Sequence, residues 1–317
     1  TTTVEDQILD VPLSAAAGGF NSQFQNAGAL ETNTWEASFS AVAIQERDMN
    51  LTFGLTFDRT RQEVTELNVP PFFQGSSTQG ANVFFVAPGE TFGVIYGRKF
   101  VTSLDQLSST QTGSGATYEV NNEGYVVTGL GTAAESPVTF EEENGNQIVK
   151  IGDINPDFNV GFNTNFTFKG LNLYMLWDAK IGGDIYNQTK QWLYRENRHG
   201  DFDQSGKADA DKKPVNYYQG FYNANNVSNY FIEDGTYLKL REFSAGYNFT
   251  KDQLGSLGEL FESVRVSVVG RNLLTITDYS GYDPEVGGIN GDQSNFAFDG
   301  FSYPNFRSIS GSLELRF

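Results

Sequence analysis

The sequence has no cysteine and only one histidine, His199, in 317 residues. The lack of cysteine excludes disulfide bridges and thiol catalysis. A single histidine argues against a histidine-rich metal site or a Ser-His-Asp triad. Basic residues are also scarce, because 21 Lys and Arg stand against 39 Asp and Glu. This balance argues against nucleic-acid binding, which needs a basic surface. No nucleophile–base pair stands out either, and we expect no enzymatic activity.

Long apolar runs are absent as well. No segment approaches the roughly 20 apolar residues that a membrane helix needs. The first residues, TTTVEDQILD, are polar and acidic, unlike a signal peptide. What the sequence has in plenty is glycine and aromatic residues, with 34 Gly, 27 Phe and 15 Tyr. This mixture is typical of β-structure with many turns.

Seven segments alternate between apolar and polar residues, as two-sided strands do. They are 35–43, 51–58, 157–168, 171–180, 237–249, 264–272 and 307–317. In DFNVGFNTNFTF (157–168) Phe158, Phe162 and Phe166 share one face. Only Lys169-Gly170 separates this segment from LNLYMLWDAK (171–180), which predicts a tight hairpin. The alternation slips near Arg241-Glu242, which indicates a β-bulge or a strand top above a bilayer.

The connections between these segments alternate in length. Short ones lie at 46–49, 169–170 and 250–261, and long ones at 60–156, 181–236 and 273–306. Ordinary domains seldom contain such long loops. Transmembrane β-barrels combine short periplasmic turns with long extracellular loops, and their strands are apolar outside and polar inside. The sequence therefore predicts an all-β fold, an antiparallel transmembrane β-barrel portion with its C-terminus on the periplasmic side. A soluble β-sandwich is the alternative, but it rarely shows this pattern of loop lengths.

The segment DFDQSGKADAD (201–211) has oxygen-bearing residues at alternate positions. Positions 1, 3, 5, 7 and 9 of a calcium loop would be Asp201, Asp203, Ser205, Lys207 (through its carbonyl) and Asp209, with Gly206 at the turn. Lys212 stands where such loops carry a bidentate acid, so Asp211 or an outside carboxylate would have to replace it. The segment is therefore either a Ca²⁺ site or a solvated acidic loop tip, and an extracellular placement favours calcium.

The connection 181–236 is rich in aromatic residues with Asn and Asp nearby. Those singled out are Trp192, Tyr194, Tyr217, Tyr218, Tyr222 and Tyr230. Flat rings beside polar groups suit stacking on a sugar or a peptide, or contact with a partner protein. The alternative is that these rings pack the connection against itself.

Several motifs, taken in order, resemble one family. They are NAGALETNTWEASFSAVAI (26–44), PGETFGVIYGRKF (88–100), GDINPDFNVGF (152–162), GGDIYNQT (182–189), YFIEDGTYLKLREFSAGYNF (230–249), VRVSVVGRNLLTITDYSGYDPEV (264–286) and YPNFRSISGSLELRF (303–317). Together they resemble the C-terminal part of SusC-like (SusC/RagA) TonB-dependent outer-membrane transporters. The terminal Phe317 resembles the sorting signal that ends outer-membrane β-barrel proteins.

This resemblance implies a fold, a function and partners. The family has a barrel of about 22 strands with a plug, of which this chain would supply about seven strands at the C-terminal end. Residues 1–33 would be the end of a preceding strand and an extracellular loop, residues 34–317 the last strands and loops, and the plug would be absent. We therefore expect a fragment of a longer polypeptide, or one of several chains that complete the barrel.

The resemblance also implies active import of oligosaccharides or peptides across the outer membrane. Its partners would be a SusD-like surface lipoprotein, the rest of the barrel and plug, TonB through the missing N-terminal part, and outer-membrane lipid. Apart from calcium in the Asp-rich loop, no cofactor is expected. The alternative is a structural or adhesive surface protein that uses the barrel as an anchor.

Overall fold

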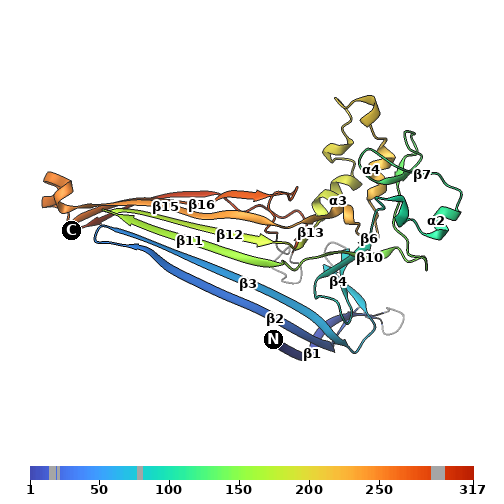
Figure 1. Cartoon of the computed structure of the whole chain (residues 1–317), viewed down its shortest axis with the longest axis horizontal. Coiled ribbons are helices and arrows are strands. Elements are labelled where there is room, and N and C mark those ends of the chain that lie inside the picture. The colour runs from blue at the N-terminus through green and yellow to red at the C-terminus, as the bar shows by residue number, and fades with distance from the viewer. Residues whose placement is uncertain (14–18, 20–21, 77–80, 287–296) are drawn as a thin grey trace.

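The computed structural model describes residues 1–13, 19, 22–76, 81–286 and 297–317. Long strands form one end of the molecule and a folded lobe forms the other (Figure 1). Within the described residues, one sheet holds eight strands in the order β1-β2-β3-β11-β12-β15-β16-β18. Their bounds are β1 (Thr2–Pro12), β2 (Ser22–Gln45), β3 (Met49–Leu67), β11 (Phe158–Phe168), β12 (Leu171–Ile181), β15 (Tyr237–Thr250), β16 (Ser263–Thr277) and β18 (Ser308–Arg316). Every neighbouring pair is antiparallel.

Two local predictions about this sheet are confirmed. Phe168 pairs directly with Leu171, so Lys169 and Gly170 form a two-residue turn, and both have positive φ values of 45° and 92°. This is the conformation that right-twisted hairpins favour. The register between β15 and β16 shifts between Leu240 and Glu242, which is the expected bulge. The bulge returns Leu240 to the apolar face of the sheet.

The strands near the N-terminus extend farther than the alternation indicated. β2 begins at Ser22, inside the segment expected to be a strand end and a loop, and β3 continues to Leu67. The parts of β2 and β3 near the lobe pair with each other, and β2 there also pairs with β1. Apolar residues there, such as Leu30 and Val64, are buried with Phe72 and Val86 in a small core. Because these residues pack in a core, the parts of β2 and β3 near the lobe lack the simple two-sided pattern of the parts near the short turns.

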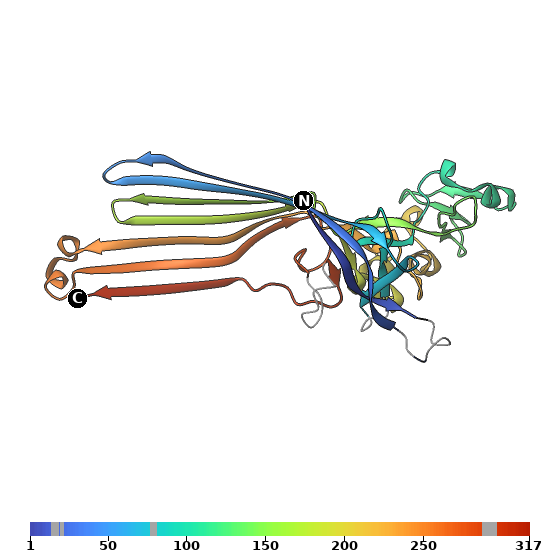
Figure 2. The same cartoon turned by 90° about the horizontal axis from the view of Figure 1, so that it is seen from below.

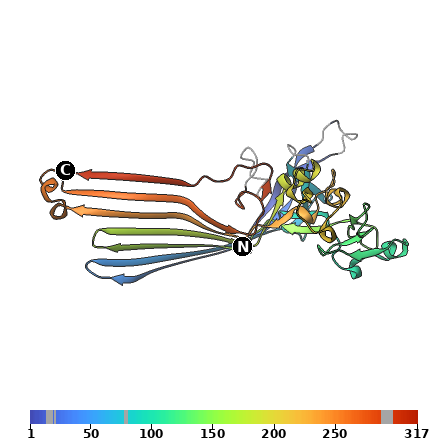
Figure 3. The ribbon, with the colours of Figure 1, turned by 90° about the horizontal axis from the view of Figure 1, so that it is seen from above.

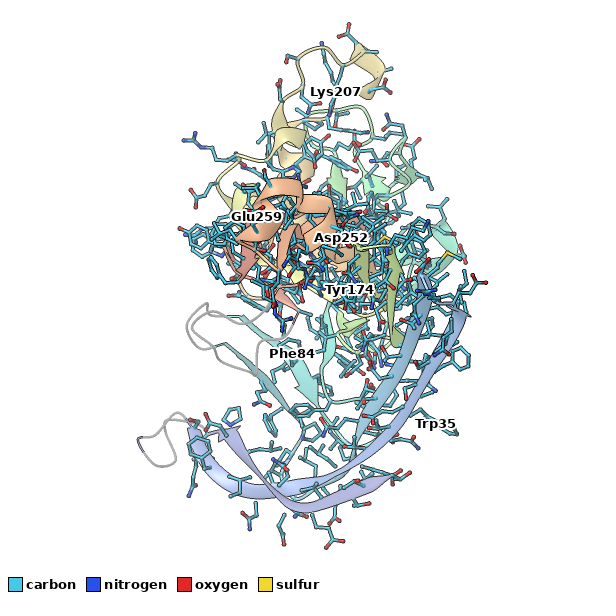
Figure 4. The ribbon with its side chains drawn as sticks, turned by 90° about the vertical axis from the view of Figure 1, so that its left-hand side faces the viewer. Trp35, Phe84, Tyr174, Lys207, Asp252 and Glu259 are labelled. Carbon is cyan, nitrogen blue, oxygen red and sulfur yellow. The ribbon has the colours of Figure 1, made fainter. Side chains whose placement is uncertain are left out.

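The register aligns apolar residues of successive strands into continuous rows on one face. One row runs Phe39, Leu55, Phe162, Trp177, Leu240, Leu274. A row on the opposite face runs Ser38, Thr56, Gly161, Asp178, Lys239, Thr275. The sheet is curved, and Figure 4, viewed along the strands, shows Trp35 on its convex side. The convex face is therefore apolar and the concave face polar.

The apolar row residues lie on a surface and not in a dry interior. Phe162 is 38% exposed and Val266 is 44% exposed, and Phe53 and Leu173 are partly exposed. A single layer of sheet with an exposed apolar face needs another apolar medium or a partner against that face. Among the described residues, none of the helices is both long and apolar enough to cross a membrane.

The three long connections are folded segments that join in one lobe. The first holds β4 (Phe72–Ser76), β5 (Ala81–Val86), β6 (Val94–Arg98), η1 (Leu104–Gln106), α2 (Ser109–Gly113), β7 (Tyr118–Val120), β8 (Val126–Thr128), β9 (Ser136–Pro137) and β10 (Ile148–Asp153). The second holds β13 (Asp184–Asn187), α3 (Gln188–Arg195), η2 (Gly200–Phe202), η3 (Asp209–Asp211), α4 (Val215–Phe221), η4 (Asn229–Phe231) and β14 (Ile232–Asp234), and the third holds β17 (Phe298–Asp299). Residues 287–296 of the third connection lie outside the described residues, as do 77–80 of the first and 14–18 and 20–21 of the segment 1–33.

The lobe and the short turns lie at opposite ends of the molecule, as Figures 2 and 3 show. The short connections join β2 to β3 and β11 to β12, and the third, between β15 and β16, contains η5 (Lys251–Glu259). The C-terminus lies at this same end (Figure 2). The predicted asymmetry of short and long connections is therefore also a separation in space.

Candidate functional site in the loop lobe

An aromatic core holds the lobe together. Tyr194, Phe221 and Phe231 come from the second long connection, Phe100 from the first and Phe298 from the third, and each is at most 1% exposed. Phe221 stacks on Tyr230 with a centroid distance of 3.9 Å, and Phe100 meets Phe221 edge-on at 4.8 Å. Aromatic pairs in these geometries add stability beyond the area they bury. The three connections therefore support one another.

The predicted contact aromatics are divided between this core and the surface. Tyr194, Tyr217 and Tyr218 are at most 2% exposed, so they lie out of reach of a ligand at the surface and pack the connection against itself. Trp192, Tyr222 and Tyr230 are partly exposed. Trp192 lies under the Arg195 guanidinium at 4.5 Å and beside the Phe301 ring at 5.8 Å. Tyr230 stacks on Phe221 and has Lys190 Nζ 4.9 Å from its ring centroid, so Trp192 and Tyr222 are the rings of this set that a ligand or partner can reach more readily.

The first acid of the predicted calcium loop faces this core. The Tyr194 hydroxyl donates a hydrogen bond to the Asp201 carboxylate, and His199 Nδ1 lies 3.1 Å from the same oxygen. His199 Nδ1 is also 3.3 Å from the Asp201 amide, so a protonated ring donates to the carboxylate and a neutral ring can accept from the amide. The hydrogen bond from His199, followed by that from Tyr194, holds the pKa of Asp201 below its usual range, although burial acts the other way. Burial raises the pKa of Tyr194.

Replacement of this carboxylate should weaken the lobe in a pH-dependent way. A depressed pKa contributes stability that is present above the unfolded value, about 3.9 for Asp, and is lost as pH falls through the lower folded value. We expect Asp201→Asn to cost about 1 kcal/mol at neutral pH, a modest loss because the carboxylate is 39% exposed. Near-ultraviolet circular dichroism during urea unfolding measures it. A difference that grew as the pH was lowered below 4 would contradict the assignment.

The other residues of the Asp-rich loop also have partners within the protein. Asp203 Oδ1 accepts from the Ser205 amide at 2.9 Å, Asp209 pairs with Lys212 at 2.7 Å, and Asp211 accepts from Asn122 at 3.0 Å. Lys207 donates to the Tyr218 hydroxyl at 3.2 Å. Among the residues that the structure describes, no three acidic or histidine side chains gather as a metal-binding group. As arranged, the loop does not fit a calcium ion, and binding would require Asp201 to leave the aromatic core.

Calcium binding by residues 201–211 stays a prediction. If the loop rearranges around the ion, isothermal titration with millimolar calcium gives heat that Asp203→Ala and Asp201→Asn each abolish, because both carboxylates would be ligands. Asp105→Asn, in η1, is the control and leaves the heat unchanged. Absence of heat from the unaltered protein contradicts the prediction.

A buried ion pair lies beneath a pocket of about 690 Å³. Lys213 Nζ and Glu135 Oε1 are 2.8 Å apart, with side chains 4% and 2% exposed. Asn121 and the Gly131 amide also donate to Glu135. Burial alone would raise the pKa of Glu135, but hydrogen bonds from Lys213, the Gly131 amide and Asn121 hold it below its usual value. The pair joins the first long connection to the second, 78 residues along the chain.

A second pocket, of about 230 Å³, lies between α3 and the third long connection. Asn187, Lys190, His199, Ser280 and Asp299 are among its lining residues. Lys190 is anchored by Glu233 at 3.1 Å and lies 4.9 Å from the Tyr230 ring centroid. The pocket therefore offers amide, hydroxyl, cationic and anionic groups within one small volume. Such a set suits a polar ligand that both donates and accepts hydrogen bonds.

A cluster of charges fastens the third connection to the concave face of the sheet. Lys239 Nζ lies 2.5 Å from Asp283 and 2.9 Å from Glu285, and its side chain is 3% exposed. Arg241 binds Glu285 at 2.6 Å. Asn305 donates from its backbone amide to Asp283 and from its side chain to Glu285, at 3.2 and 2.9 Å. Both ends of the connection are therefore tied to β15 at one point.

Replacement of the buried Lys239 should loosen the attachment of the third long connection to the sheet. We expect Lys239→Met to speed amide hydrogen exchange in residues 279–286 and 297–306 by at least about tenfold, because Asp283 would lose its cation in a buried site. Lys150→Met is the matched control, since Lys150 pairs with Glu90 at 3.1 Å but is 48% exposed. Equal exchange rates in the unaltered protein and Lys239→Met would show that the loop is held by other contacts.

The sequence did not identify these two charge clusters. Lys239 and Arg241 are two residues apart on a strand, which is a usable signal for charges on the polar face. Their acidic partners are 44 residues or more along the chain, beyond the reach of local patterns. Glu135 and Lys213 carry no local signal, because only the packing of two connections brings them together.

Comparisons with known proteins agree with this fold. No family model matches the chain. The chain is similar to TonB-dependent receptor P3 of Formosa agariphila, with 27% identity over 100% of this chain and 32% of the relative. It is also similar to TonB-dependent receptor P39 of the same organism, with 26% identity over 99% of this chain and 33% of the relative. The chain thus spans about a third of the length of the curated relatives it matches.

Solved structures share the fold at lower identity. The structure of the RagAB peptide transporter matches 99% of this chain and 32% of its own, with a TM-score of 0.67 and 19% identity. The RagAB peptide importer in the 'open-open' state matches the same shares with a TM-score of 0.65. At this identity the likeness concerns the fold. Together with the curated relatives, it confirms the resemblance that the motifs indicated: the chain is similar to about a third of the length of TonB-dependent receptors and shares the fold of the RagAB structures.

Proposed function

We propose that the protein is part of an outer-membrane transporter that imports oligosaccharides or peptides with energy delivered by TonB. The observation that carries the proposal is the continuous apolar row across successive strands, from Phe39 to Leu274, with polar residues opposite it. An apolar exterior and a polar interior are the requirements of a barrel wall in lipid. The names of the curated relatives support TonB-dependent function, and those relatives are receptors, not enzymes.

In this proposal the strands cross the outer membrane with the lobe outside the cell. The short turns and Phe317 then face the periplasm. β1 and β18 are the edges of the sheet among the described residues, and an unpaired strand edge is not tolerated in hydrocarbon. The rest of the barrel pairs with these edges, and a plug with a TonB-contacting segment belongs to the same polypeptide or to another chain.

The lobe is proposed as the part that meets the substrate and a SusD-like lipoprotein. Trp192 and Tyr222 are partly exposed, and the pocket beside α3 offers Lys190, Ser280 and Asp299. Exposed rings stack on sugars and on peptide side chains, and mixed polar groups fix orientation. The RagAB structures are described as peptide transporters, which supports peptides as one of the two substrate classes.

Uptake by intact cells tests the function. Cells that carry the gene and cells that lack it receive labelled oligosaccharides and labelled peptides, with and without an uncoupler of the proton gradient that energises TonB. We expect one substrate class to enter only when the gene and the gradient are both present. Co-purification of a surface lipoprotein and a plug-bearing segment would agree with this result.

Unchanged uptake of both classes would contradict the proposal. If the lobe were nevertheless accessible to protease on intact cells, a structural or adhesive role with the barrel as an anchor would then be favoured. A complete assembly without any plug would point the same way.

A further inference from the structure

The turn between β15 and β16 is much longer than the other turns at its end of the molecule. It spans residues 251–262 and contains η5, whereas two residues, 169 and 170, join β11 to β12. Two leucines in it expose large apolar side chains, Leu257 to 56% and Leu260 to 62%. Hairpin closure does not need this length, and exposed leucines in water are unfavourable.

Contacts place this turn beside the convex, apolar face of the sheet. Gln253 Nε2 donates to the Tyr247 hydroxyl at 2.9 Å. Tyr247 pairs with Leu171 and Val266, so it belongs to the apolar face. The Phe261 ring meets the Phe317 ring at 5.0 Å. The turn therefore contacts that face near both of its ends.

The exposed apolar residues of the turn continue the rows of the strands. Phe249 and Val264 pair at the base of β15 and β16, and Leu315 follows on β18. Beyond them come Leu257, Leu260 and the Phe317 ring, which is 75% exposed. Acidic residues of the turn, Asp252 and Glu259, are exposed at the end of the molecule nearest the viewer in Figure 4. Apolar groups beside the lipid-facing rows and charges at the outer end form the arrangement of an interfacial segment.

We propose that the β15–β16 turn lies in the interface of the periplasmic lipid leaflet, with Leu257 and Leu260 among the parts of the acyl chains nearest the headgroups. The occupant of this apolar surface is lipid, because the surface is continuous with the apolar rows of the barrel wall. The inference rests on the proposed outer-membrane location. The turn thus extends the membrane-contacting surface beyond the strands and contacts the terminal ring of Phe317 through Phe261.

Tryptophan quenching by brominated lipid tests this placement. The three native tryptophans, Trp35, Trp177 and Trp192, are replaced by Phe, and single tryptophans are introduced as Leu257→Trp and Leu260→Trp. The protein, with every segment that its gene encodes, is reconstituted in phosphatidylethanolamine and phosphatidylglycerol vesicles with and without brominated chains. Val266→Trp on the strand face is the positive control. Leu104→Trp is the negative control, since Leu104 is 48% exposed in the lobe.

We expect quenching at 257 and 260 to be comparable to that at 266 and at least about twofold stronger than at 104. Quenching at 266 without quenching at 257 and 260 would overturn the inference and leave the turn in periplasmic water. Failure of quenching at 266 would instead overturn the membrane location, and with it both proposals. Two tryptophan positions in the turn guard against a local effect of either substitution.

Discussion

Val268→Arg should prevent stable assembly of the protein in the outer membrane. Val268 lies midway along β16, pairs with Ala245 and Gly311, and is 51% exposed on the apolar face. An arginine near the middle of the lipid-facing surface of a barrel costs about 2–4 kcal/mol. That cost is a large part of the stability of a typical folded domain. We expect a folded, heat-modifiable form to be lost on unheated gels, with protein recovered as aggregate or degraded.

Ser267→Arg, one residue earlier, is the matched control. Ser267 lies on the concave face, where its hydroxyl is 2.6 Å from that of Ser312. An arginine there points into the polar interior, where Arg265 and Arg271 already lie on the same strand face. We expect this variant to assemble. If both variants assembled equally well, the outer face would not meet hydrocarbon, and the proposed membrane location would be wrong.

Lys213→Met should destabilise the lobe by about 3–5 kcal/mol, the range for breaking a buried ion pair by removing one partner. Glu135 would remain buried and charged, with only Asn121 and the Gly131 amide to donate to it. Without its cation, the buried Glu135 would have a raised pKa and would take up a proton more readily. The destabilisation caused by Lys213→Met should therefore shrink as the pH falls below the range in which Glu ionises. Urea unfolding followed through the near-ultraviolet signal of the tyrosine-rich core measures the change.

Two further variants separate this cause from a general loss of packing. Lys213→Met combined with Glu135→Gln should recover part of the stability, because no unpaired charge remains. Lys212→Met should have no measurable effect, since Lys212 pairs with Asp209 at the surface, where the side chains are 46% and 97% exposed. If Lys213→Met matched Lys212→Met, the pair between the two connections would not hold the lobe together.

Local sequence was enough to predict the strands of the sheet between the short turns and the lobe. Side chains on a strand alternate between two faces, and in DFNVGFNTNFTF this period is interrupted only by Thr164. The turn at Lys169-Gly170 and the bulge at Arg241 also depend on neighbouring residues, so they could be recognised before the structure was known. The alternation is less clear in the parts of β2 and β3 near the lobe, because Leu30 and Val64 pack there in a small core.

The packing of side chains in the lobe could not be predicted without the tertiary structure. Tyr194 and Tyr217 appear in the sequence as aromatic residues in a polar stretch, which fits a ligand surface as well as a core. Their burial follows from a core that they share with residues such as Phe298, which lies more than 80 residues later. Asp201 has the spacing of a calcium ligand, yet it accepts a hydrogen bond from the Tyr194 hydroxyl. Local spacing cannot show which direction a side chain takes once distant segments pack against it.

The two-sided strands, their order as hairpins and the apolar face that they present together follow from the amino-acid sequence alone. These features depend on a period of two residues and on connection length, and both can be read along the chain. The union of the three long connections in one lobe, with Lys213 paired to Glu135 and Lys239 to Asp283, becomes visible in the folded protein. Ion pairs between residues 44 and 78 positions apart depend on how whole segments pack, and no local pattern encodes that packing.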